Sequence, residues 1–308
     1  MLRRLVAGEL TEDEALAEIR RVQLDELGGR ARLDLGRYLR RGIPEVVLAT
    51  GKSPADAARL TLRMAHEHGQ GLISRMAEAH RAALHDAAGG MRIIEYQSSA
   101  RVMRQGFEAE AVDGRVAILT AGTSDGPIAE EARMVVEACG LEARLEADLG
   151  VAGLHRFVAP LATLLEWGAD VIVVAAGMDG VLPGLVAGLV DVPVIGLPVS
   201  TGYGRGGAGE GALTTMLQSC STGLVVVNID NGIGAGAAAV LIAQRRRRGL
   251  STANTANTSA LRISRPKTAA ATKRETSAPP GSAKTSARRT TVRTTPASNH
   301  GKPRRGRP

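Results

Sequence analysis

Three segments of the chain combine glycines with polar side chains in the manner of ligand-binding loops. Gly122-Thr123-Ser124-Asp125-Gly126-Pro127 would present backbone N–H groups and two hydroxyls to an anion, and its proline suits a first helical turn. Gly177-Met178-Asp179-Gly180 offers a carboxylate for acid–base chemistry, and His155-Arg156 offers an acid–base group beside a cation. Helix capping by the serine and aspartate side chains explains the first two segments without any chemistry.

Two further glycine-containing motifs resemble nucleotide-binding loops. Gly202-Tyr203-Gly204-Arg205-Gly206-Gly207 matches G-x-G-x-x-G, but three residues separate it from the next predicted helix, so we expect a mobile glycine-rich active-site loop. Gly51-Lys52-Ser53 is not a phosphate loop, because Val46 stands where a Walker motif needs glycine. The serine and the following Pro54 suit a helix start, which leaves Lys52 as a candidate anion contact.

The chain contains two cysteines, Cys139 and Cys220. They are too far apart in the sequence for a disulfide framework or a cysteine-based metal motif. Cys220 falls between a predicted helix and the last predicted strand. It is either an inert buried thiol or a nucleophile, and its reactivity depends on its surroundings.

The elements that must position these residues alternate between strands and helices. Apolar runs of strand length lie at Val116–Thr120, Leu141–Ala147, Val171–Ala176, Val194–Val199 and Leu224–Ile229. Helical patterns follow them at about Pro127–Ala138, Leu154–Trp167, Val181–Leu189, Glu210–Gln218 and Ile233–Gln244. Most of the apolar runs lack polar alternation, which predicts a doubly wound α/β fold with a parallel sheet buried on both faces. Ligands bind such sheets beyond the carboxyl ends of the strands, where the loops above fall.

We expect three parts along the chain. Residues 1–112 form a small α/β N-terminal region, 113–244 the parallel α/β domain, and 245–308 a disordered basic tail. In the first part, Thr11 and Glu14 form a capping-box pattern, Glu45–Thr50 is strand-like and Ala55–Glu67 is helical.

The net charge of +8 is distributed unevenly. Residues 245–308 contain 17 Lys or Arg and one acid, whereas the preceding 244 residues contain 22 basic and 30 acidic residues. The tail has few large apolar side chains to offset its ordering entropy, so we expect it to be disordered. It either solubilises the protein or binds a polyanion weakly.

Composition disfavours two classes of protein. Only six aromatic residues occur, which argues against a nucleic-acid binder built on stacking rings. No apolar run is long enough to span a membrane, and five acidic residues lie where a signal peptide would be apolar. We therefore expect a soluble cytoplasmic protein that does not enter a membrane.

Taken together, these segments resemble the phosphoribosylaminoimidazole carboxylase (PurE-like) fold, chiefly at 121–125, 182–187 and 193–199. Within that superfamily the chain is most similar to the nickel-pincer cofactor biosynthesis protein B family. The segments that carry this similarity are 150–156, 177–180, 202–207, 217–220 and 228–236. Residues 41–46 and Gly51-Lys52 resemble that family's N-terminal motif, which the purine enzyme lacks. The resemblance covers about residues 10–244 and excludes the tail.

The resemblance implies a carboxylase and hydrolase that acts on nicotinic acid adenine dinucleotide. Such an enzyme, a pyridinium-3,5-biscarboxylic acid mononucleotide synthase, adds CO2 or bicarbonate to the pyridinium ring. It also cleaves the phosphoanhydride, releasing AMP and the biscarboxylated mononucleotide for nickel-pincer cofactor biosynthesis. A divalent ion, magnesium, is implied, and so is a homo-octamer with sites formed between subunits.

The resemblance also assigns roles to individual residues. Cys220 corresponds to the nucleophile, and Asp179 or His155 would act as the base, although the family usually has Glu where this chain has Asp179. A further set would contact the substrate: Gly122, Thr123, Ser124, Asp125, Arg156, Gly177, Met178 and Lys52. No metal ligands are assigned.

Two other functions fit parts of the sequence. An aminoimidazole ribonucleotide carboxylase or mutase of purine biosynthesis would share the fold but would need neither Cys220 nor the N-terminal region. A non-catalytic nucleotide-binding module with a polyanion-binding tail is the second alternative. The negative charge of residues 1–244 argues against the latter.

Overall fold

A computed structural model describes residues 2–11, 13–14, 25–27, 31–33, 37 and 41–260, all within one unit, Met1–Leu261. The predicted disorder of residues 261–308 lies outside the described part of the chain.

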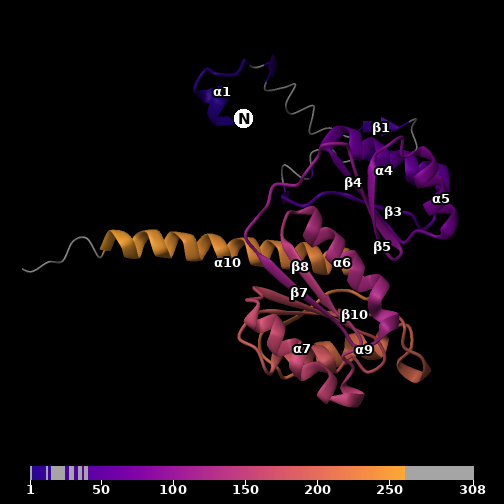
Figure 1. The fold of residues 1–308 in the computed structure, drawn as a ribbon, viewed down its shortest axis with the longest axis vertical. Coiled ribbons are helices and arrows are strands. Elements are labelled where there is room, and N and C mark those ends of the chain that lie inside the picture. The colour runs from indigo at the N-terminus through magenta and orange to yellow at the C-terminus, as the bar shows by residue number, and fades with distance from the viewer. Residues whose placement is uncertain are drawn as a thin grey trace, which may run out of the picture. The chain divides into compact units, whose positions relative to one another are not determined.

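A five-stranded parallel sheet forms the second half of this unit (Figure 1). Its strands are β7 (Arg115–Thr120), β8 (Glu142–Glu146), β9 (Val171–Ala176), β10 (Val194–Pro198) and β11 (Leu224–Val226). They are arranged in the order β11-β10-β9-β7-β8, and every neighbouring pair is parallel. The predicted parallel sheet is confirmed.

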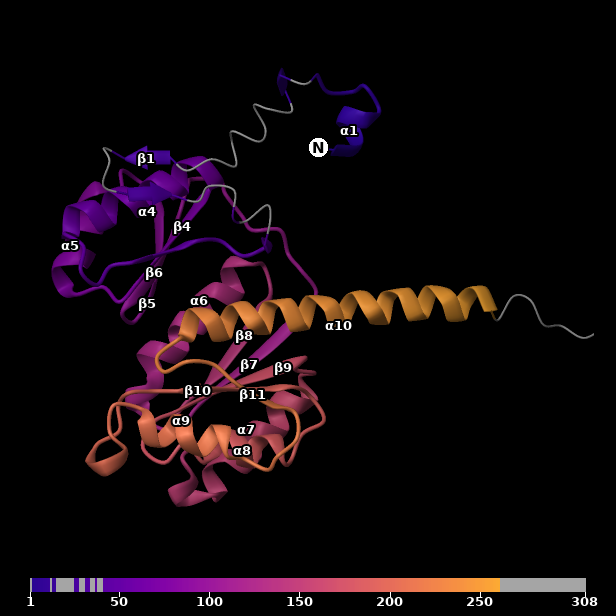
Figure 2. The ribbon, with the colours of Figure 1, turned by 180° about the vertical axis from the view of Figure 1, so that it is seen from behind.

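Helices cover both faces of this sheet, as the views in Figures 1 and 2 show. One face carries α6 (Gly126–Ala138) and α10 (Gly232–Ala260), and the other carries α7 (His155–Glu166), α8 (Leu182–Ala187) and α9 (Glu210–Leu217). Each face has its own apolar core, because alternate residues of the buried strands point to opposite sides. The fold is therefore doubly wound, as the alternation of strand and helix patterns predicted.

The strand order places a switch point between β7 and β9. From β7 the chain moves outward to β8, and it then returns to β9 and continues through β10 to β11 on the other side. The loops that follow β7 and β9 consequently diverge at the carboxyl edge of the sheet. In doubly wound sheets this divergence opens the crevice in which ligands bind.

A second, mixed sheet precedes the parallel one. Its strands β3 (Val46–Leu48), β4 (Gln70–Ser74), β6 (Ser99–Met103) and β5 (Arg92–Tyr96) lie in that order. The β3–β4 pair is parallel and the other pairs are antiparallel. Helices α4 (Pro54–His68) and α5 (Glu78–Ala87) supply apolar side chains to one face of it. Ahead of β3, the described residues form the short elements α1 (Leu2–Val6), β1 (Asp25–Leu27) and β2 (Ala31–Leu33).

Local capping in this region follows the sequence patterns. Ser53 Oγ accepts a hydrogen bond from Asp56 N at 3.1 Å, which caps α4 as the Ser-Pro start predicts. Thr11 Oγ1 accepts from Glu14 N at 3.2 Å, and Glu14 Oε2 accepts from Thr11 N at 2.8 Å. These reciprocal bonds form the predicted capping box.

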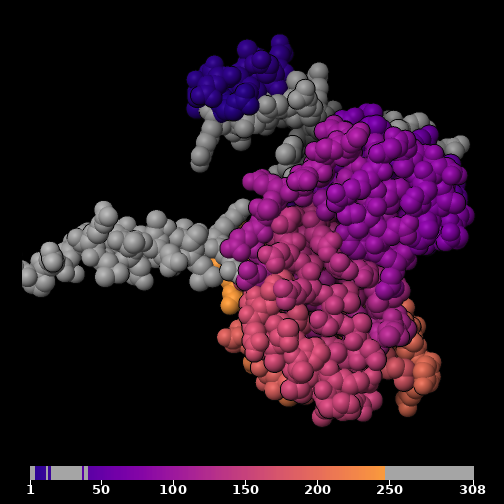
Figure 3. Space-filling model, viewed as in Figure 1, coloured from indigo at the N-terminus to yellow at the C-terminus, as the bar shows by residue number. Residues whose placement is uncertain are grey.

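Helix α6 packs against both sheets. Its residues Ala129, Ala132 and Val135 belong to the core of the parallel sheet. Met134 and Ala138, on its other side, pack with Leu72 and Tyr96 of the mixed sheet. These contacts lie on the face of that sheet that α4 and α5 do not cover. Figure 3 shows one surface of the two sheet domains, the first in purple and the second in pink. The helix that begins directly after Asp125 is thus held from two sides.

Two element ends differ from the predicted positions by three residues or more. Helix α10 continues to Ala260, so residues 245–260 are helical although we expected them in the disordered tail. Arginine is a good helix former, and Arg246 Nη1 donates to Asp170 O at 3.1 Å, which holds the continuing helix to the sheet. Strand β11 ends at Val226, before a turn in which Asp230 has a left-handed φ of 57°. Within the described part of the chain, no helix is both long and apolar enough to span a membrane.

Candidate active site

A crevice of about 350 Å³ lies at the switch point between β7 and β9. Its walls come from four loops at the carboxyl edge of the sheet, those after β7, β8, β9 and β10. The lining includes Gly122, Ser124, Asp125, Arg156, Gly177, Met178 and Asp179. The tertiary structure therefore brings together seven of the residues that the sequence predicts for the site.

Asp125 is the most enclosed acid of this crevice, with 3% of its surface exposed. Its Oδ2 accepts a hydrogen bond from Gly122 N at 2.8 Å, and its Oδ1 accepts from Thr201 Oγ1 at 2.8 Å. Burial raises the pKa of the Asp125 carboxyl, and the donors Gly122, Thr201 and Gly177 oppose that shift. The carboxylate is held in one orientation by loops that lie far apart in the sequence.

Gly177 permits this arrangement. A Cβ atom at this position would lie 2.3 Å from Thr201 Oγ1 and 3.3 Å from Asp125 Oδ1. The first of these distances is shorter than real Cβ contacts, so a side chain here would displace the threonine hydroxyl. The loops after β9 and β10 approach Asp125 closely because residue 177 has no side chain.

Arg156 forms the cationic side of the crevice. Its Nη1 donates to Asp148 Oδ2 at 2.9 Å, and its Nη2 donates to Gly150 O at 3.5 Å. Both partners belong to the loop after β8, so the guanidinium is anchored in the crevice that the loop after β7 also lines. The arginine remains partly exposed and can also contact a phosphate.

The loop after β9 contributes two exposed residues. Met178 has a left-handed φ of 45° and is 50% exposed, and Asp179 follows it. Asp179 Oδ1 accepts a hydrogen bond from Val181 N at 3.3 Å, which is a local turn contact. Helix α8 has no side-chain cap, so the capping role that competed with chemistry at this carboxylate is not formed. A strained non-glycine residue beside an exposed carboxylate is typical of functional loops.

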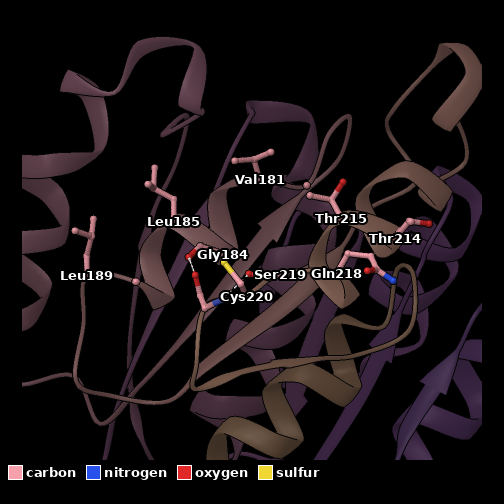
Figure 4. Close-up of a pocket in the computed structure, with 12 residues that line it drawn as sticks. Val181, Gly184, Leu185, Leu189, Thr214, Thr215, Gln218, Ser219 and Cys220 are labelled. Atoms are coloured by element: carbon pink, nitrogen blue, oxygen red, sulfur yellow. Dashed lines mark hydrogen bonds between the residues drawn. The ribbon is translucent and has the colours of Figure 1, made fainter.

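Cys220 lies elsewhere, in an open cavity of about 670 Å³ between α8 and α9. Figure 4 shows Val181, Leu185 and Leu189 on one side of this cavity, Thr214, Thr215 and Gln218 on the other, and Cys220 between them. The thiol is exposed, so the alternative of an inert buried cysteine does not apply to it. Within one chain, Cys220 and Asp125 do not share a cavity. Gly180 and Val181, which follow Asp179, link the two cavities along the chain.

Three other predicted site residues do not line the crevice. Thr123 and His155 are exposed neighbours of lining residues, and His155 is the first residue of α7. Lys52 lies in the N-terminal domain, after β3, where its Nζ donates to Leu48 O at 2.8 Å. None of these three side chains therefore lines the crevice.

Thr201 was not among the residues predicted for the site, and Tyr203 was predicted only as part of the glycine-rich loop. Both residues line the crevice, and Tyr203 is 79% exposed. The signal for Thr201 was present, because a Ser-Thr pair directly follows a buried strand of the predicted sheet. Among the described residues, no group of three or more His, Cys, Asp or Glu side chains could hold a metal ion.

Comparison with known proteins gives matches to both domains. A family model described as AIR carboxylase matches residues 115–262, and one described as LarB/PurE-like N-terminal domain matches residues 24–106. A solved structure of Treponema denticola PurE shares 19% identity, with a TM-score of 0.33; the match covers 49% of this chain and 99% of that chain.

Two relatives are similar in sequence. An uncharacterized protein of Methanocaldococcus jannaschii is 38% identical over 244 residues, which are 77% of this chain and 93% of the relative. The N5-carboxyaminoimidazole ribonucleotide mutase of Thermotoga maritima is 28% identical over 127 residues, 41% of this chain and 74% of the mutase. The longer alignment and the two matched domains, in this order, establish that the chain belongs to the nickel-pincer cofactor biosynthesis protein B (LarB) family, an enzyme family with a PurE-like domain of the carboxylase and mutase type.

Proposed function

We propose that this protein carboxylates the pyridinium ring of nicotinic acid adenine dinucleotide and hydrolyses its phosphoanhydride. The products are pyridinium-3,5-biscarboxylic acid mononucleotide and AMP. One observation carries the proposal: an exposed thiol, Cys220, accompanies the anion-binding crevice in a chain that also has the LarB-type N-terminal domain. The carboxylation chemistry requires such a thiol.

The requirement follows from the electron demand of the ring. A pyridinium is too electron-poor to attack CO2. Addition of a thiolate forms a C–S bond and turns the ring into a neutral, enamine-like dihydropyridine, whose carbon can attack CO2 and form the new C–C bond. A base then removes the proton from that carbon, the C–S bond breaks, and the sulfur leaves as thiolate. The aromatic pyridinium is restored and the cysteine is regenerated.

The crevice supplies groups suited to the remainder of the substrate. Arg156 and the N–H groups and hydroxyls of the loop after β7 suit phosphate and ribose oxygens. Asp179, exposed at the rim, suits the base, and His155 is the alternative. Hydrolysis consists of attack by water on one phosphorus of the anhydride, with departure of the other phosphate; AMP and the mononucleotide then separate.

The separation of Cys220 from Asp125 within one chain supports a site completed by a second copy. The cavity of Cys220 is lined in part by apolar side chains that are unusually exposed, with Val181 40% and Leu189 59% exposed. Leu217, at the end of α9, is 63% exposed. Side chains of this kind are typical of surfaces that become buried on association. We therefore propose a homo-oligomer, an octamer by resemblance, in which one copy brings Cys220 to the crevice of another.

Magnesium is part of the proposal. Mg²⁺ sites generally use one or two carboxylates and complete the coordination with substrate phosphates and water. The crevice fits this pattern, since Asp179 offers an exposed carboxylate beside the phosphate-binding loop. The ion would neutralise charge on the phosphoanhydride; with Asp179 as its ligand, His155 would act as the base.

The direct test is incubation of the purified protein with the dinucleotide, bicarbonate and Mg²⁺, followed by mass analysis. The expected products are AMP and a mononucleotide that is heavier, by one added CO2, than the nicotinic acid mononucleotide half of the substrate. Release of AMP without carboxylation would contradict the proposed chemistry. Conversion of aminoimidazole ribonucleotide or its N5-carboxy derivative instead would favour a mutase of the kind found in T. maritima.

A mixing experiment tests the shared site. Cys220→Ser and Asp125→Asn proteins should each be inactive. When they are dissociated and reassembled together, some sites would combine an intact crevice with an intact cysteine, and activity should return. Mixed oligomers that stay inactive would show that both residues must come from the same chain.

A further inference from the structure

Arg75 connects the N-terminal domain to two elements of the parallel domain. It directly follows β4 and has a left-handed φ of 56°, which is rare for a residue other than glycine. Its Nε donates to Glu131 Oε1 at 3.3 Å, and its Nη2 donates to the carbonyl oxygen of Asp230. One side chain thus contacts both α6 and the turn between β11 and α10.

Each of these contacts leads to Asp125. Asp230 Oδ1 accepts a hydrogen bond from Ser200 N at 2.8 Å, and the next residue, Thr201, donates its hydroxyl to Asp125 Oδ1 at 2.8 Å. Glu131 lies in the N-terminal half of α6, the helix that begins directly after Asp125. Arg75 is therefore connected to the Asp125 carboxylate from both sides, although it does not line the crevice.

A second strained residue of the same domain reinforces this arrangement. Gln97 has a left-handed φ of 50°, and its side chain lies against Gly126, where a Cβ atom would be 2.8 Å from Gln97 Nε2. The loops that carry Arg75 and Gln97 are joined by a hydrogen bond from Met76 N to Ser98 O at 2.7 Å. Two costly backbone conformations thus coincide where the N-terminal domain meets the N-terminal half of α6, as expected at a functional contact.

The Glu131 carboxyl gives Arg75 a strong hold on α6. Glu131 is fully buried, and Arg75 is the partner of its Oε1. A buried carboxylate needs a paired cation and hydrogen bonds, so removal of the guanidinium would disturb α6 as well as the Asp230 turn.

We propose that Arg75 is a positioning residue, through which the N-terminal domain fixes the Asp125 carboxylate by way of Asp230, Ser200 and Thr201. The proposal rests on the proposed function insofar as Asp125 serves catalysis, but the physical connection does not depend on the identity of the substrate.

The first measurement needs no substrate. In hydrogen–deuterium exchange of the ligand-free protein, Arg75→Gln should accelerate exchange of the Gly122 and Ser200 amides by about tenfold, because both amides donate to carboxylates on the connected path. Arg75→Lys, which keeps the charge but cannot form both contacts, should give a smaller increase. Exchange at these amides that matches the wild type in both variants would overturn the proposal.

Arg101 offers a matched control. This arginine of β6 also spans the two domains, since its Nη1 donates to Glu137 O at 3.2 Å, but it contacts the opposite end of α6. Arg101→Gln should weaken the contact between the domains without accelerating exchange at Gly122 and Ser200. Equal acceleration in the Arg75 and Arg101 variants would reduce Arg75 to a general structural role and refute the proposal.

The second measurement uses the pH profile of dinucleotide carboxylation. The Thr201 hydrogen bond lowers the pKa of Asp125, so its loosening in Arg75→Gln should move the acidic limb of kcat/KM to higher pH. Arg101→Gln should leave the limb in place, and Thr201→Val should reproduce the shift without adding to it in the double variant. An unshifted limb would contradict the proposal. Absence of carboxylation in the wild type would instead refute the proposed function, and the exchange data would still decide the role of Arg75.

Discussion

The substitution Gly177→Ala probes the crevice with a single methyl group. The added Cβ would lie 2.3 Å from Thr201 Oγ1, whereas its distance of 3.4 Å from Gly202 N is ordinary contact. The threonine hydroxyl is therefore the group that must move, and its 2.8 Å hydrogen bond to Asp125 Oδ1 must break. The backbone of residue 177 is not left-handed, so alanine adds no backbone strain.

The expected loss follows from the broken hydrogen bond. A hydrogen bond to an ionised group contributes about 1.5–3 kcal/mol. If the Asp125 carboxylate acts on the substrate, this loss lowers kcat/KM roughly 10- to 150-fold. Overpacking adds a destabilisation of about 1–3 kcal/mol. The pKa of Asp125 should rise further, so activity should be lost at a higher pH as the solution is acidified.

The assay compares Gly177→Ala in two backgrounds, wild type and Thr201→Ala. In the second background the clashing oxygen is absent, so the added methyl group should cost little more in kcat/KM or in the free energy of unfolding by urea. Gly122→Ala is the control for the free energy of unfolding, because its Cβ would meet only ordinary contacts of 3.6 and 3.7 Å. Equal costs of Gly177→Ala in both backgrounds would refute the reasoning.

Five further outcomes are expected. Cys220→Ser should lose carboxylation by several orders of magnitude in the product assay, because a hydroxyl is scarcely ionised where a thiol is partly thiolate. Cys139→Ala should cost only packing, since that thiol is buried and burial raises its pKa to about 12; activity lost with Cys139 would contradict this. Lys52→Ala should raise the KM for the dinucleotide more than it weakens mononucleotide binding measured by calorimetry. Equal effects on both ligands would indicate that the segment of Lys52 serves only to cap a helix. Burial raises the pKa of Glu131, so the folded state binds the proton of this carboxyl more tightly than the unfolded chain does. The folded state therefore loses stability as the pH rises above the ordinary glutamate range. Glu131→Gln should therefore unfold at higher urea concentration near neutral pH and lose this pH dependence. Truncation after Ala260 should preserve turnover and reduce salt-sensitive retention on a polyanion column; a folded but inactive product would refute this.

The order of elements in the parallel domain could be predicted from the sequence because each element has a local signature. Uninterrupted apolar runs such as Val171–Ala176 became strands buried on both faces, and Pro127 marked the first turn of α6. Parallel strands end at a common edge, so the polar loops around Asp125 and Asp179 could be expected to meet there, and the crevice contains both. The catalytic roles of Cys220, Asp179 and His155 remain predictions.

Long-range contacts decided the rest. The Thr201–Asp125 hydrogen bond joins residues 76 positions apart, and the Arg75–Asp230 contact spans 155 positions. No periodicity in the sequence encodes such pairs, because they depend on how strands are ordered and on how α6 packs between two sheets. For the same reason, the sequence could identify Cys220 as chemically distinctive but could not reveal that it opens into a different cavity from Asp125. A residue's type and neighbours determine the chemistry it can perform, whereas the tertiary packing determines which other groups it can reach.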